Sequence, residues 1–404
     1  MTAEPSIAAE PAEPAEPAQP VVAPPLAVPE QEYRVRAARL RRAMRRRGLS
    51  AVALTSPENL YYLLGLDHLG YFAFTMVVVT PHGPPVLVAR RMERHTLSAQ
   101  VPGARQALYG EGQDPARTAA RVLADVTPPG SVIGVEEGSM TLPPAVLSRV
   151  RASLPDRTWS DCTALPARLR TVKSPSEAAL VRRAAVVSGA AMRAAVEAAG
   201  TGVSERTVAA RAQWAMTDAG GHQPGFVPLV RSTDRLAQEH VTWSEHRLGR
   251  GEGLFVELSG CVHRYHAPMS RTVYCGEAPP DAALAAEAAL AGLRAARAAL
   301  VPGAVTGAVY AAWAGAVAAI TGRRPRRHHC GYLTGIGFPP SWVGGGSVPG
   351  IRAGGRTRVR AGMVVHLMSW VDRPAGHVIS DTALVLPDGA ELLTDAPRNL
   401  IVQP

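Results

Sequence analysis

The sequence predicts an α+β protein in which a smaller N-terminal α/β domain precedes a larger domain of helices packed on an antiparallel sheet. Three observations support this fold class. The 404 residues suffice for two ordinary domains, and an apolar content of 47% suffices for their cores. Short apolar runs alternate with helical patterns over residues 33–165. Beyond them, the order helix, helix, strands occurs twice, which indicates an internal duplication.

The N-terminal segment, residues 1–30, consists of repeated Ala-Glu-Pro followed by a stretch rich in Val and Pro. This composition cannot bury a core, so we expect a disordered tail. The N-terminal α/β domain is then expected to span residues 31–168. Its patterns predict helices at 33–47, 91–100, 114–125 and 143–153 and strands at 51–54, 72–79, 86–89 and 132–135.

A strong helix start lies near the beginning of the second domain, which we expect to span residues 169–404. Ser174 suits the N-cap, Pro175 the first helical position, and Glu177 completes a capping box three residues after the cap. Further helices are expected at about 204–219, 281–300 and 303–321, with short strands over 330–385.

The second domain contains an apolar run, Leu254 to Leu258, that carries one carboxylate, Glu257. A turn with Gly260 is expected next, followed by a second strand rich in polar side chains. A lone ionisable group in an apolar strand is costly unless it is paired or used. Burial would raise its pKa, which suits a base or a nucleophile near neutral pH. The alternative is a structural carboxylate paired with an arginine such as Arg271.

The composition excludes several classes of protein. The net charge of +10 comes from scattered arginines, and the one dense block, Arg34 to Arg47, has the pattern of a helix with a solvated face. The four cysteines form no CxxC pair, so we expect reduced thiols. No segment has the apolar length of a membrane span, and no signal peptide begins the chain. We therefore expect a cytoplasmic protein with no nucleic-acid or membrane partner.

Several stretches, in order and spacing, resemble the creatinase/aminopeptidase P family, whose catalytic domain has the pita-bread fold. They are 169–177 with 181–185, 302–303, 362–365 and 380–394. The resemblance covers about residues 35–400. It implies a pita-bread catalytic domain at 169–404. It also implies a homodimer in which the N-terminal domain, including His68, lies near the partner's site.

Peptidases of this family bind two metal ions through two Asp, one His and two Glu. The matching positions here are Glu257, Pro268, Tyr332, Met368 and Ser380. Proline and methionine cannot ligate a hard cation, and tyrosine or serine is a poor substitute for histidine or glutamate. The resemblance therefore implies that the dinuclear metal centre is absent, and we expect no metal and no other cofactor.

The motifs are most similar to the metal-free branch that includes creatinase and the ectoine hydrolases. The shared runs are 257–272, 331–342 and 362–366. His240 lies 17 residues before Glu257 and matches the histidine that is the general acid/base in creatinase. The glutamate that matches Glu257 is thought to act directly on the substrate carbon. The resemblance thus implies Glu257 and His240 as the catalytic pair.

The resemblance and the residue types also suggest substrate contacts. His266 and His366 recur in the ectoine-hydrolase-like pattern and are expected to touch the substrate. Tyr265, Arg271 and Tyr332 are expected to position a carboxylate or an oxyanion, although a structural ion pair is the alternative for Arg271.

The other histidines are not expected to bind a metal ion or the substrate. A zinc site is disfavoured, because His263 and His266, three residues apart on a strand, would point to opposite faces. His328 and His329 follow an arginine run and are expected to be solvated.

These expectations describe a metal-independent hydrolase that cleaves a C–N bond in a small polar substrate, such as a cyclic amidine, a guanidino compound or an amide. Two alternatives remain. The first is a catalytically inactive pita-bread protein that binds a ligand, against which the retained polar side chains argue. The second is a metallopeptidase that acts on Xaa-Pro peptides through relocated metal ligands.

Overall fold

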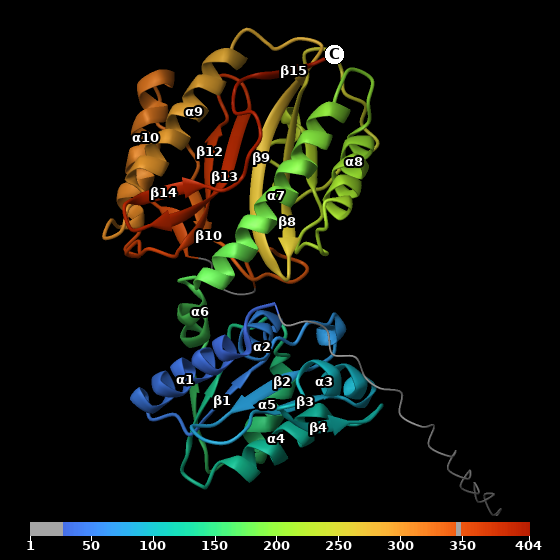
Figure 1. Ribbon diagram of the computed structural model, residues 1–404, viewed down its shortest axis with the longest axis vertical. Helices are drawn as coiled ribbons and strands as arrows, with labels where there is room; N and C mark the ends of the chain where they lie inside the picture. Colours follow the sequence, from blue (N-terminus) through green and yellow to red (C-terminus); the bar gives the residue numbers. More distant parts are fainter. Residues whose placement is uncertain (1–26, 345–348) are drawn as a thin grey trace, which may run out of the picture.

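A computed structural model describes residues 27–344 and 349–404, which form two domains joined by α6 (Ala164–Arg170) and the start of α7 (Pro175–Ala198) (Figure 1). Most of the expected tail, residues 1–26, lies outside the described residues. Val28, in contrast, is only 3% exposed and packs in a hydrophobic core, and α1 (Glu30–Arg46) begins two residues later. Regular packing therefore begins before residue 31, earlier than the composition predicted.

The N-terminal domain contains a six-stranded mixed sheet with the order β4-β3-β2-β1-β5-β6. Its strands are β1 (Ala51–Leu54), β2 (Met76–Val79), β3 (Val86–Arg90), β4 (Arg105–Tyr109), β5 (Val132–Val135) and β6 (Thr158–Asp161). Besides α1 and α6, its helices are α2 (Pro57–Leu64), α3 (Arg94–Gln100), α4 (Pro115–Val126) and α5 (Pro144–Ser153).

Both faces of this sheet are covered, which explains the continuous apolar runs of its strands. Val52 and Leu54 lie in the same core as α1, whereas Ala51 and Ala53 lie in the core formed with α4 and α5. The strand expected over 72–79 is shorter, because Gly70–Phe72 forms a 3-10 turn, η1, and only residues 76–79 pair in the sheet.

The C-terminal domain contains a curved nine-stranded sheet whose main order is β11-β10-β12-β13-β9-β8-β7 (Figure 1). In addition, β14 pairs with β13, and β15 pairs with β9. The strands are β7 (Leu229–Ser232), β8 (Gly253–Val262), β9 (Tyr265–Cys275), β10 (His329–Leu333), β11 (Gly350–Arg352), β12 (Val364–Val371), β13 (His377–Leu386), β14 (Gly389–Leu392) and β15 (Ile401–Gln403).

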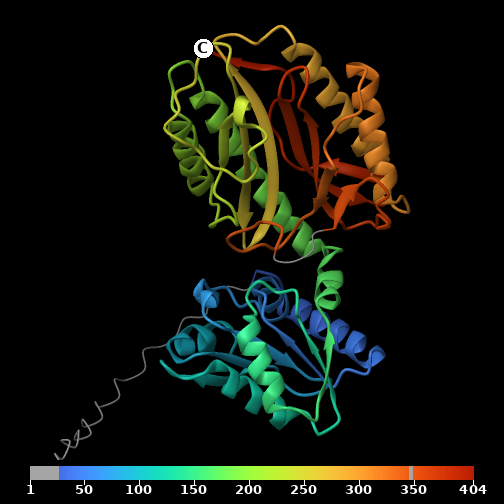
Figure 2. The same cartoon turned by 180° about the vertical axis from the view of Figure 1, so that it is seen from behind.

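Two helix pairs cover the outer face of this sheet, as Figure 2 shows from behind. They are α7 with α8 (Glu205–Asp218), and α9 (Ala282–Ala299) with α10 (Thr306–Thr321). In the first pair α7 packs on β8 and β9, and in the second α9 packs on β12 and β13. The order helix, helix, strands is thus repeated as the sequence predicted.

The predicted capping box of α7 is present. The Ser174 hydroxyl accepts a hydrogen bond from the Glu177 backbone N–H at 3.2 Å, and the Glu177 carboxylate accepts one from the Ser174 backbone N–H at 2.9 Å. These two bonds fix the start of the long helix that supports the strand of Glu257.

The turn between β8 and β9 differs from the expectation. It consists of His263 and Arg264, both with positive φ (47° and 63°), as a tight two-residue hairpin turn requires. Gly260 instead lies within β8, where a Cβ atom would lie 2.3 Å from the carbonyl oxygen of Ala184 on α7. The glycine therefore permits close helix packing and does not form the turn.

The described residues bear on two expectations from composition, which concern membrane-spanning helices and the state of the cysteines. Among these residues, no helix combines the length and apolar character needed to cross a membrane. The cysteines are all buried and unpaired, as their spacing predicted: Cys162, Cys261, Cys275 and Cys330.

Candidate active site

A cavity of about 380 Å³ opens beside β7 and β8 in the C-terminal domain. Its walls come from β7, β8, β10, β12 and the segments around residues 240, 327 and 342. Among the residues proposed from the sequence, Glu257, His240 and Tyr332 line it. The structure therefore brings together the two expected catalytic residues, which lie on different segments of the domain.

Glu257 is the buried carboxylate of this cavity, with only 7% of its surface exposed. Burial raises its pKa to about 7, although the positive charges of Arg231 and Arg327 act in the opposite direction. No described residue donates a hydrogen bond to its carboxylate. An unpaired carboxyl group that titrates near neutrality is suited to act as a base or a nucleophile.

His240 lines the cavity from the loop between η3 (Thr233–Arg235) and β8. Its backbone has a positive φ of 57°, and its exposed ring stacks on Phe226 with 6.0 Å between the ring centroids. The adjacent Glu239 forms an ion pair with Arg327. The imidazole thus lines the cavity and is also exposed to solvent.

A row of facing residues crosses five strands at the level of Glu257. Glu257 pairs with Leu229 on β7 and with Ser270 on β9, Ser270 pairs with Ser380 on β13, and Ser380 pairs with Met368 on β12. Directly paired residues share one face of a sheet, so this row presents its side chains to the same side. Three of the family's metal-ligand positions, Glu257, Ser380 and Met368, lie in it.

The remaining two metal-ligand positions lie on the same face. Pro268 is two residues from Ser270 on β9, and Tyr332 pairs with His366, two residues from Met368 on β12. The five positions therefore converge as a metal site would require, but only one of them carries a carboxylate or an imidazole. Within the described part of the chain, no cluster of three or more His, Cys, Asp or Glu is arranged to hold a metal ion.

A series of buried hydrogen bonds connects side chains at and beside the positions that match metal ligands. Trp342 Nε1–H donates to the Tyr332 hydroxyl at 2.9 Å, and this hydroxyl shares a hydrogen bond of 2.8 Å with Nδ1 of His366. Nε2 of His366 bonds the Ser380 hydroxyl at 2.6 Å, which in turn bonds the Ser270 hydroxyl at 2.7 Å. Burial lowers the pKa of His366 to about 3, so its ring is neutral.

These hydrogen bonds assign His366 a different role from the one expected from the sequence. The residue was expected to contact the substrate, but its two ring nitrogens are occupied by Tyr332 and Ser380, and it does not line the cavity. It positions the Tyr332 hydroxyl, which does line the cavity.

Arg271 was also expected to bind substrate, and this expectation is wrong. Its guanidinium is 1% exposed and pairs with Asp381 at 3.0 Å, while its other N–H groups donate to four backbone carbonyls. Every donor is used, so the structural ion pair, the alternative considered from the sequence, is the arrangement that the protein adopts.

His266 and Tyr265 also lie outside the cavity. His266 is fully buried, and Nε2 accepts a hydrogen bond from the Gly225 backbone N–H at 2.9 Å while Nδ1–H donates to the Arg264 carbonyl at 3.0 Å. It thereby fixes the segment that leads to Phe226, the ring against which His240 stacks. His266 therefore supports that segment and does not line the cavity, contrary to the expected substrate contact.

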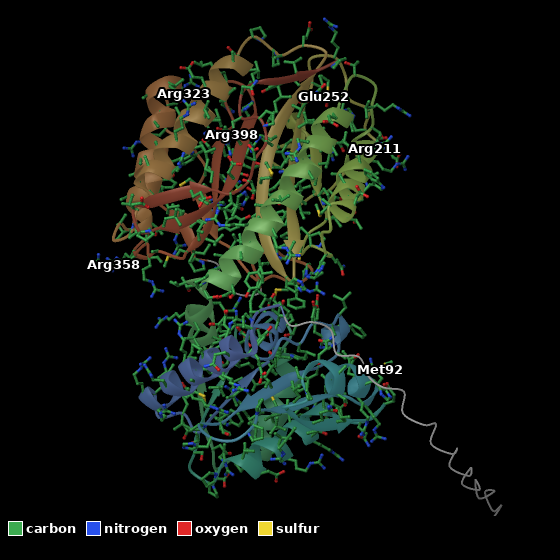
Figure 3. The ribbon with its side chains drawn as sticks, in the orientation of Figure 1. Met92, Arg211, Glu252, Arg323, Arg358 and Arg398 are labelled. Atoms are coloured by element: carbon green, nitrogen blue, oxygen red, sulfur yellow. The ribbon has the colours of Figure 1, made fainter. Side chains whose placement is uncertain are left out.

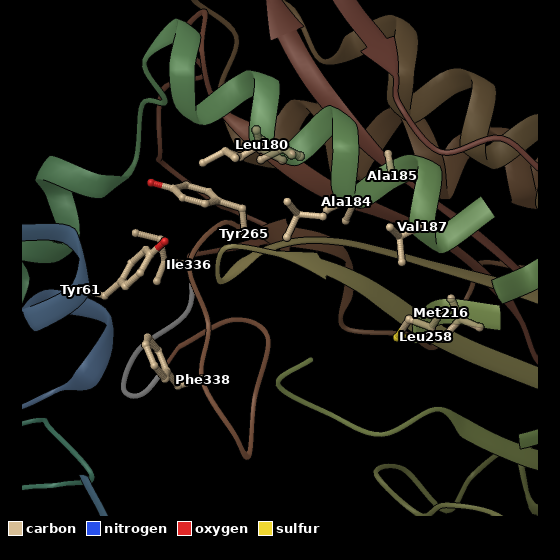
Figure 4. Close-up of a cluster of buried hydrophobic side chains, with 14 of the residues drawn as sticks. Tyr61, Leu180, Ala184, Ala185, Val187, Met216, Leu258, Tyr265, Ile336 and Phe338 are labelled. Carbon is tan, nitrogen blue, oxygen red and sulfur yellow. The ribbon is translucent and has the colours of Figure 1, made fainter. Parts of the chain in front are cut away.

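Tyr265 belongs to the contact between the domains. Its hydroxyl donates to the Glu177 carboxylate at 2.9 Å and accepts from Arg36 of α1 at 3.3 Å. Figure 4 shows its ring near Tyr61 of α2, beneath α7. His68 lies in the N-terminal domain, 3.5 Å from Glu93, and does not line the cavity of its own chain.

The sequence reasoning missed Arg231, which lines the cavity from β7. Its guanidinium is 1% exposed and lies 4.5 Å from the ring centroid of Phe255. Nη2 has one long hydrogen bond of 3.4 Å to the Leu236 carbonyl, whereas Nε and Nη1 have no partner among the described residues. Arg231 pairs with Phe255 and Glu257 with Leu229, so Arg231 and Glu257 are diagonal neighbours on one face.

His329 was also misjudged. It was expected to be solvated, yet it lines the cavity and burial lowers its pKa to about 4. The local sequence pattern could not show this, because the half-buried His329 is the first residue of β10 and pairs with Arg352 of β11, which is distant in sequence.

Comparison with known proteins identifies the family. The metallopeptidase family M24 matches residues 179–387, and the creatinase/prolidase N-terminal domain matches residues 36–172. The chain belongs to metallopeptidase family M24. The predicted creatinase/aminopeptidase P resemblance is thereby confirmed.

Two similar M24 relatives extend over nearly the whole chain. An ectoine hydrolase from Halomonas elongata is 28% identical and covers 92% of this chain and 98% of its own. An uncharacterized hydrolase/peptidase, y4tM, from Sinorhizobium fredii is 30% identical and covers 93% of this chain and 98% of its own. The expected enzyme class, a hydrolase that acts on C–N bonds, is confirmed at this coarse level.

Solved structures confirm the fold class. The dipeptidase PepE from Mycobacterium ulcerans superimposes with a TM-score of 0.78 at 25% identity and covers 92% of this chain and 98% of its own. A prolidase from Thermococcus sibiricus superimposes with a TM-score of 0.82 at 20% identity, with coverages of 92% and 99%. The C-terminal domain of this M24 member thus has the predicted pita-bread fold.

Proposed function

We propose that this M24 member is a metal-independent hydrolase of a C–N bond in a small polar substrate that carries an amidine, a guanidino group or an amide. The observation that carries the proposal is Glu257: a buried, unpaired carboxylate at a metal-ligand position whose four companion positions are Pro, Tyr, Met and Ser. The name of the ectoine hydrolase relative supports the C–N bond and the small substrate.

The residues of the cavity suit both steps of such a reaction, the attack on the carbon and the protonation of the departing nitrogen. Ionised Glu257 would attack the electrophilic carbon or activate a water molecule that does so, and His240 would give a proton to the departing nitrogen. Either route adds one water molecule across the C–N bond. The Tyr332 hydroxyl, held by Trp342 and His366, would donate to the oxygen or nitrogen that gains electron density.

Arg231 would anchor the substrate. A buried guanidinium whose Nε and Nη1 have no partner among the described residues is costly without an acceptor, and a substrate carboxylate would supply a charged one. Because Arg231 and Glu257 are diagonal neighbours, a carboxylate bound to Arg231 would bring the adjoining carbons of a small molecule to the Glu257 carboxylate. The substrate would therefore be a small acid whose C–N bond lies a few bonds from its carboxylate.

The decisive test uses metal-free protein and mass spectrometry to find a turned-over member among cyclic amidines, guanidino acids and short proline peptides. Glu257→Gln and His240→Ala should each lower kcat by at least about a hundredfold, whereas Glu287→Gln on the surface of α9 should not. Full turnover by either active-site variant would overturn the proposal. After an acid quench, a substrate adduct on the peptide that contains Glu257 would identify this residue as the nucleophile.

The same preparation distinguishes the alternatives. Stoichiometric manganese, zinc or cobalt in active protein would favour an Xaa-Pro metallopeptidase. Ligand binding without turnover of any compound would favour an inactive binding protein. We further propose a cytoplasmic homodimer in which His68 of one chain lies near the site of the other.

A further inference from the structure

A second cavity, of about 400 Å³, lies where the two domains meet. It is bordered by the end of α6, by the linker to α7 and by the segment that follows β10. Its polar lining includes Lys173, Arg170 and Thr334, none of which borders the Glu257 cavity. The mechanism proposed above uses no residue of this second cavity.

Lys173 is the only lysine in the chain, and it is 9% exposed. Among the described residues, its ammonium group makes one hydrogen bond, a long one of 3.5 Å to the carbonyl of Thr171. The group lies directly over Gly335, where an added Cβ would be 2.9 Å from Nζ. An ammonium ion has three donors, so the contacts from the described residues leave two of them unused.

Two more polar groups in this cavity have no partner among the described residues. They are Nε of Arg170 and the hydroxyl of Thr334, which is 4% exposed. Burial and the positive charge of Arg170 disfavour the charged form of Lys173, whereas the negative charge of Glu177 favours it. Among the described residues, Lys173, Arg170 and Thr334 thus border one space with unused hydrogen-bond donors, which an acceptor would satisfy.

The carboxylates around this cavity already have other partners. Glu136 accepts hydrogen bonds from the backbone N–H groups of Thr55 and Ser56 and from Asn59. Glu177 is occupied by its capping-box bond and by the Tyr265 hydroxyl. Asp161 accepts from the backbone N–H and the hydroxyl of Thr163. One further acid, Glu58, feels the charge of Arg170, but burial raises its pKa and favours its neutral form.

We propose that this cavity is a binding site for a small oxyanion, a carboxylate or a phosphate, held by Lys173, Arg170 and Thr334. Its volume is at the lower end of the range for small-molecule sites. The ligand would link the domains, because Arg170 ends the last helix before the linker and Thr334 belongs to the sheet domain. Thr334 is also two residues from Tyr332, so occupancy would be felt at β10 of the Glu257 cavity.

The proposal is tested by calorimetric titration of the full chain with sodium phosphate and, separately, sodium succinate at constant ionic strength. We expect saturable binding of at least one anion and a thermal unfolding midpoint that rises with its concentration. Lys173→Met and Arg170→Met should weaken binding at least tenfold. Arg211→Met, which removes an exposed charge on α8 (Figure 3), should not change it. Saturation by one anion alone identifies the ligand class.

Two further measurements test the anion site if Lys173→Met does not fold. Thr334→Val removes only the hydroxyl and should weaken binding severalfold. Reductive methylation with ¹³C-formaldehyde labels one side chain, Lys173, and bound anion should raise the pH at which its signal titrates. No saturation by either anion, or equal binding by the Arg170, Thr334 and Arg211 variants, would overturn the site. Glu257→Gln should bind the anion unchanged, so this outcome is independent of the proposed hydrolase activity.

Discussion

Nδ1 of His366 lies 3.9 Å from the Glu257 carboxylate, yet His366 does not neutralise it. Both ring nitrogens are occupied by the hydroxyls of Tyr332 and Ser380, and burial lowers the pKa of the ring to about 3. A neutral imidazole cannot offset the desolvation of Glu257. The carboxyl group therefore keeps a pKa of about 7, as the proposed role of Glu257 as a base or a nucleophile requires.

Activity should depend on the ionisation of Glu257. The carboxylate is the reactive form, so kcat/KM should rise with pH and reach half of its plateau near pH 7, well above the ordinary glutamate value of 4.5. Arg327→Met removes a positive charge that favours the carboxylate and should move this midpoint to higher pH. The profile is measured with the confirmed substrate from pH 4 to 9. A midpoint below pH 5 would contradict the role assigned to Glu257.

Glu257 should also destabilise the folded protein above neutral pH. Its pKa is 4.5 when unfolded and about 7 when folded, so the folded state favours the neutral form. Below pH 4.5 both states are protonated and no penalty exists. The penalty grows as pH rises to 7 and then stays at about 3 kcal/mol.

Glu257→Gln should therefore raise the free energy of unfolding by up to about 3 kcal/mol at pH 8 and by little at pH 4.5. Urea denaturation at both pH values measures this difference, with Glu287→Gln as the exposed control. An equal effect at both values would indicate altered packing and not ionisation.

Arg231 should make the enzyme prefer a substrate that carries a carboxylate. Arg231→Met should raise KM for a carboxylate substrate at least tenfold and leave its carboxamide analogue nearly unaffected, because only the former loses a charge-assisted hydrogen bond. Binding of both compounds to Glu257→Gln protein, with and without Arg231→Met, separates recognition from turnover. Equal losses for both compounds would show that Arg231 supports the strand and not the ligand.

The sequence could predict that Glu257, Ser380 and Met368 belong to one site, because the resemblance matches all three to metal-ligand positions of the family. It could not distinguish which polar side chains of their strands face the cavity. Arg271 and Tyr265 lie on the same strand as Ser270 but are used by Asp381 and Glu177, groups that are distant in sequence. Arg231 was missed because its importance comes from its diagonal position relative to Glu257, a cross-strand relationship that no local pattern contains.

Arg271 should contribute to stability and not to substrate binding. Arg271→Met leaves the fully buried Asp381 with the partly exposed Arg398 as its remaining ion-pair partner, and it removes four bonds to backbone carbonyls. We expect a loss of about 3–5 kcal/mol in the free energy of unfolding, as for other broken buried pairs. Arg398→Met, which removes the more exposed partner, should cost clearly less. KM of the Arg271 variant, measured at a temperature where it remains folded, should stay within about twofold of the unmodified enzyme.

The proposed homodimer can be tested at the surface around His68. The neighbouring turns η1 and η2 (Arg91–Glu93) expose apolar side chains: Phe72 is 80% exposed, Met92 66% and Leu69 46% (Figure 3 labels Met92). Their proximity follows from the 3.5 Å contact between His68 and Glu93. Exposed apolar groups gathered in this way are typical of a surface that another chain covers.

Phe72→Ser should therefore weaken self-association, raising the dimer dissociation constant at least tenfold in analytical ultracentrifugation, because a large apolar side chain would no longer be buried. Trp214→Ser is the matched control, since Trp214 is 64% exposed on α8 of the other domain. If His68 serves the partner's site, the Phe72 variant should also lose activity on dilution and regain it at high protein concentration. A Phe72 variant that remains dimeric at nanomolar concentration would place the interface elsewhere, and a concentration-independent loss of activity would indicate that η1 acts within its own chain.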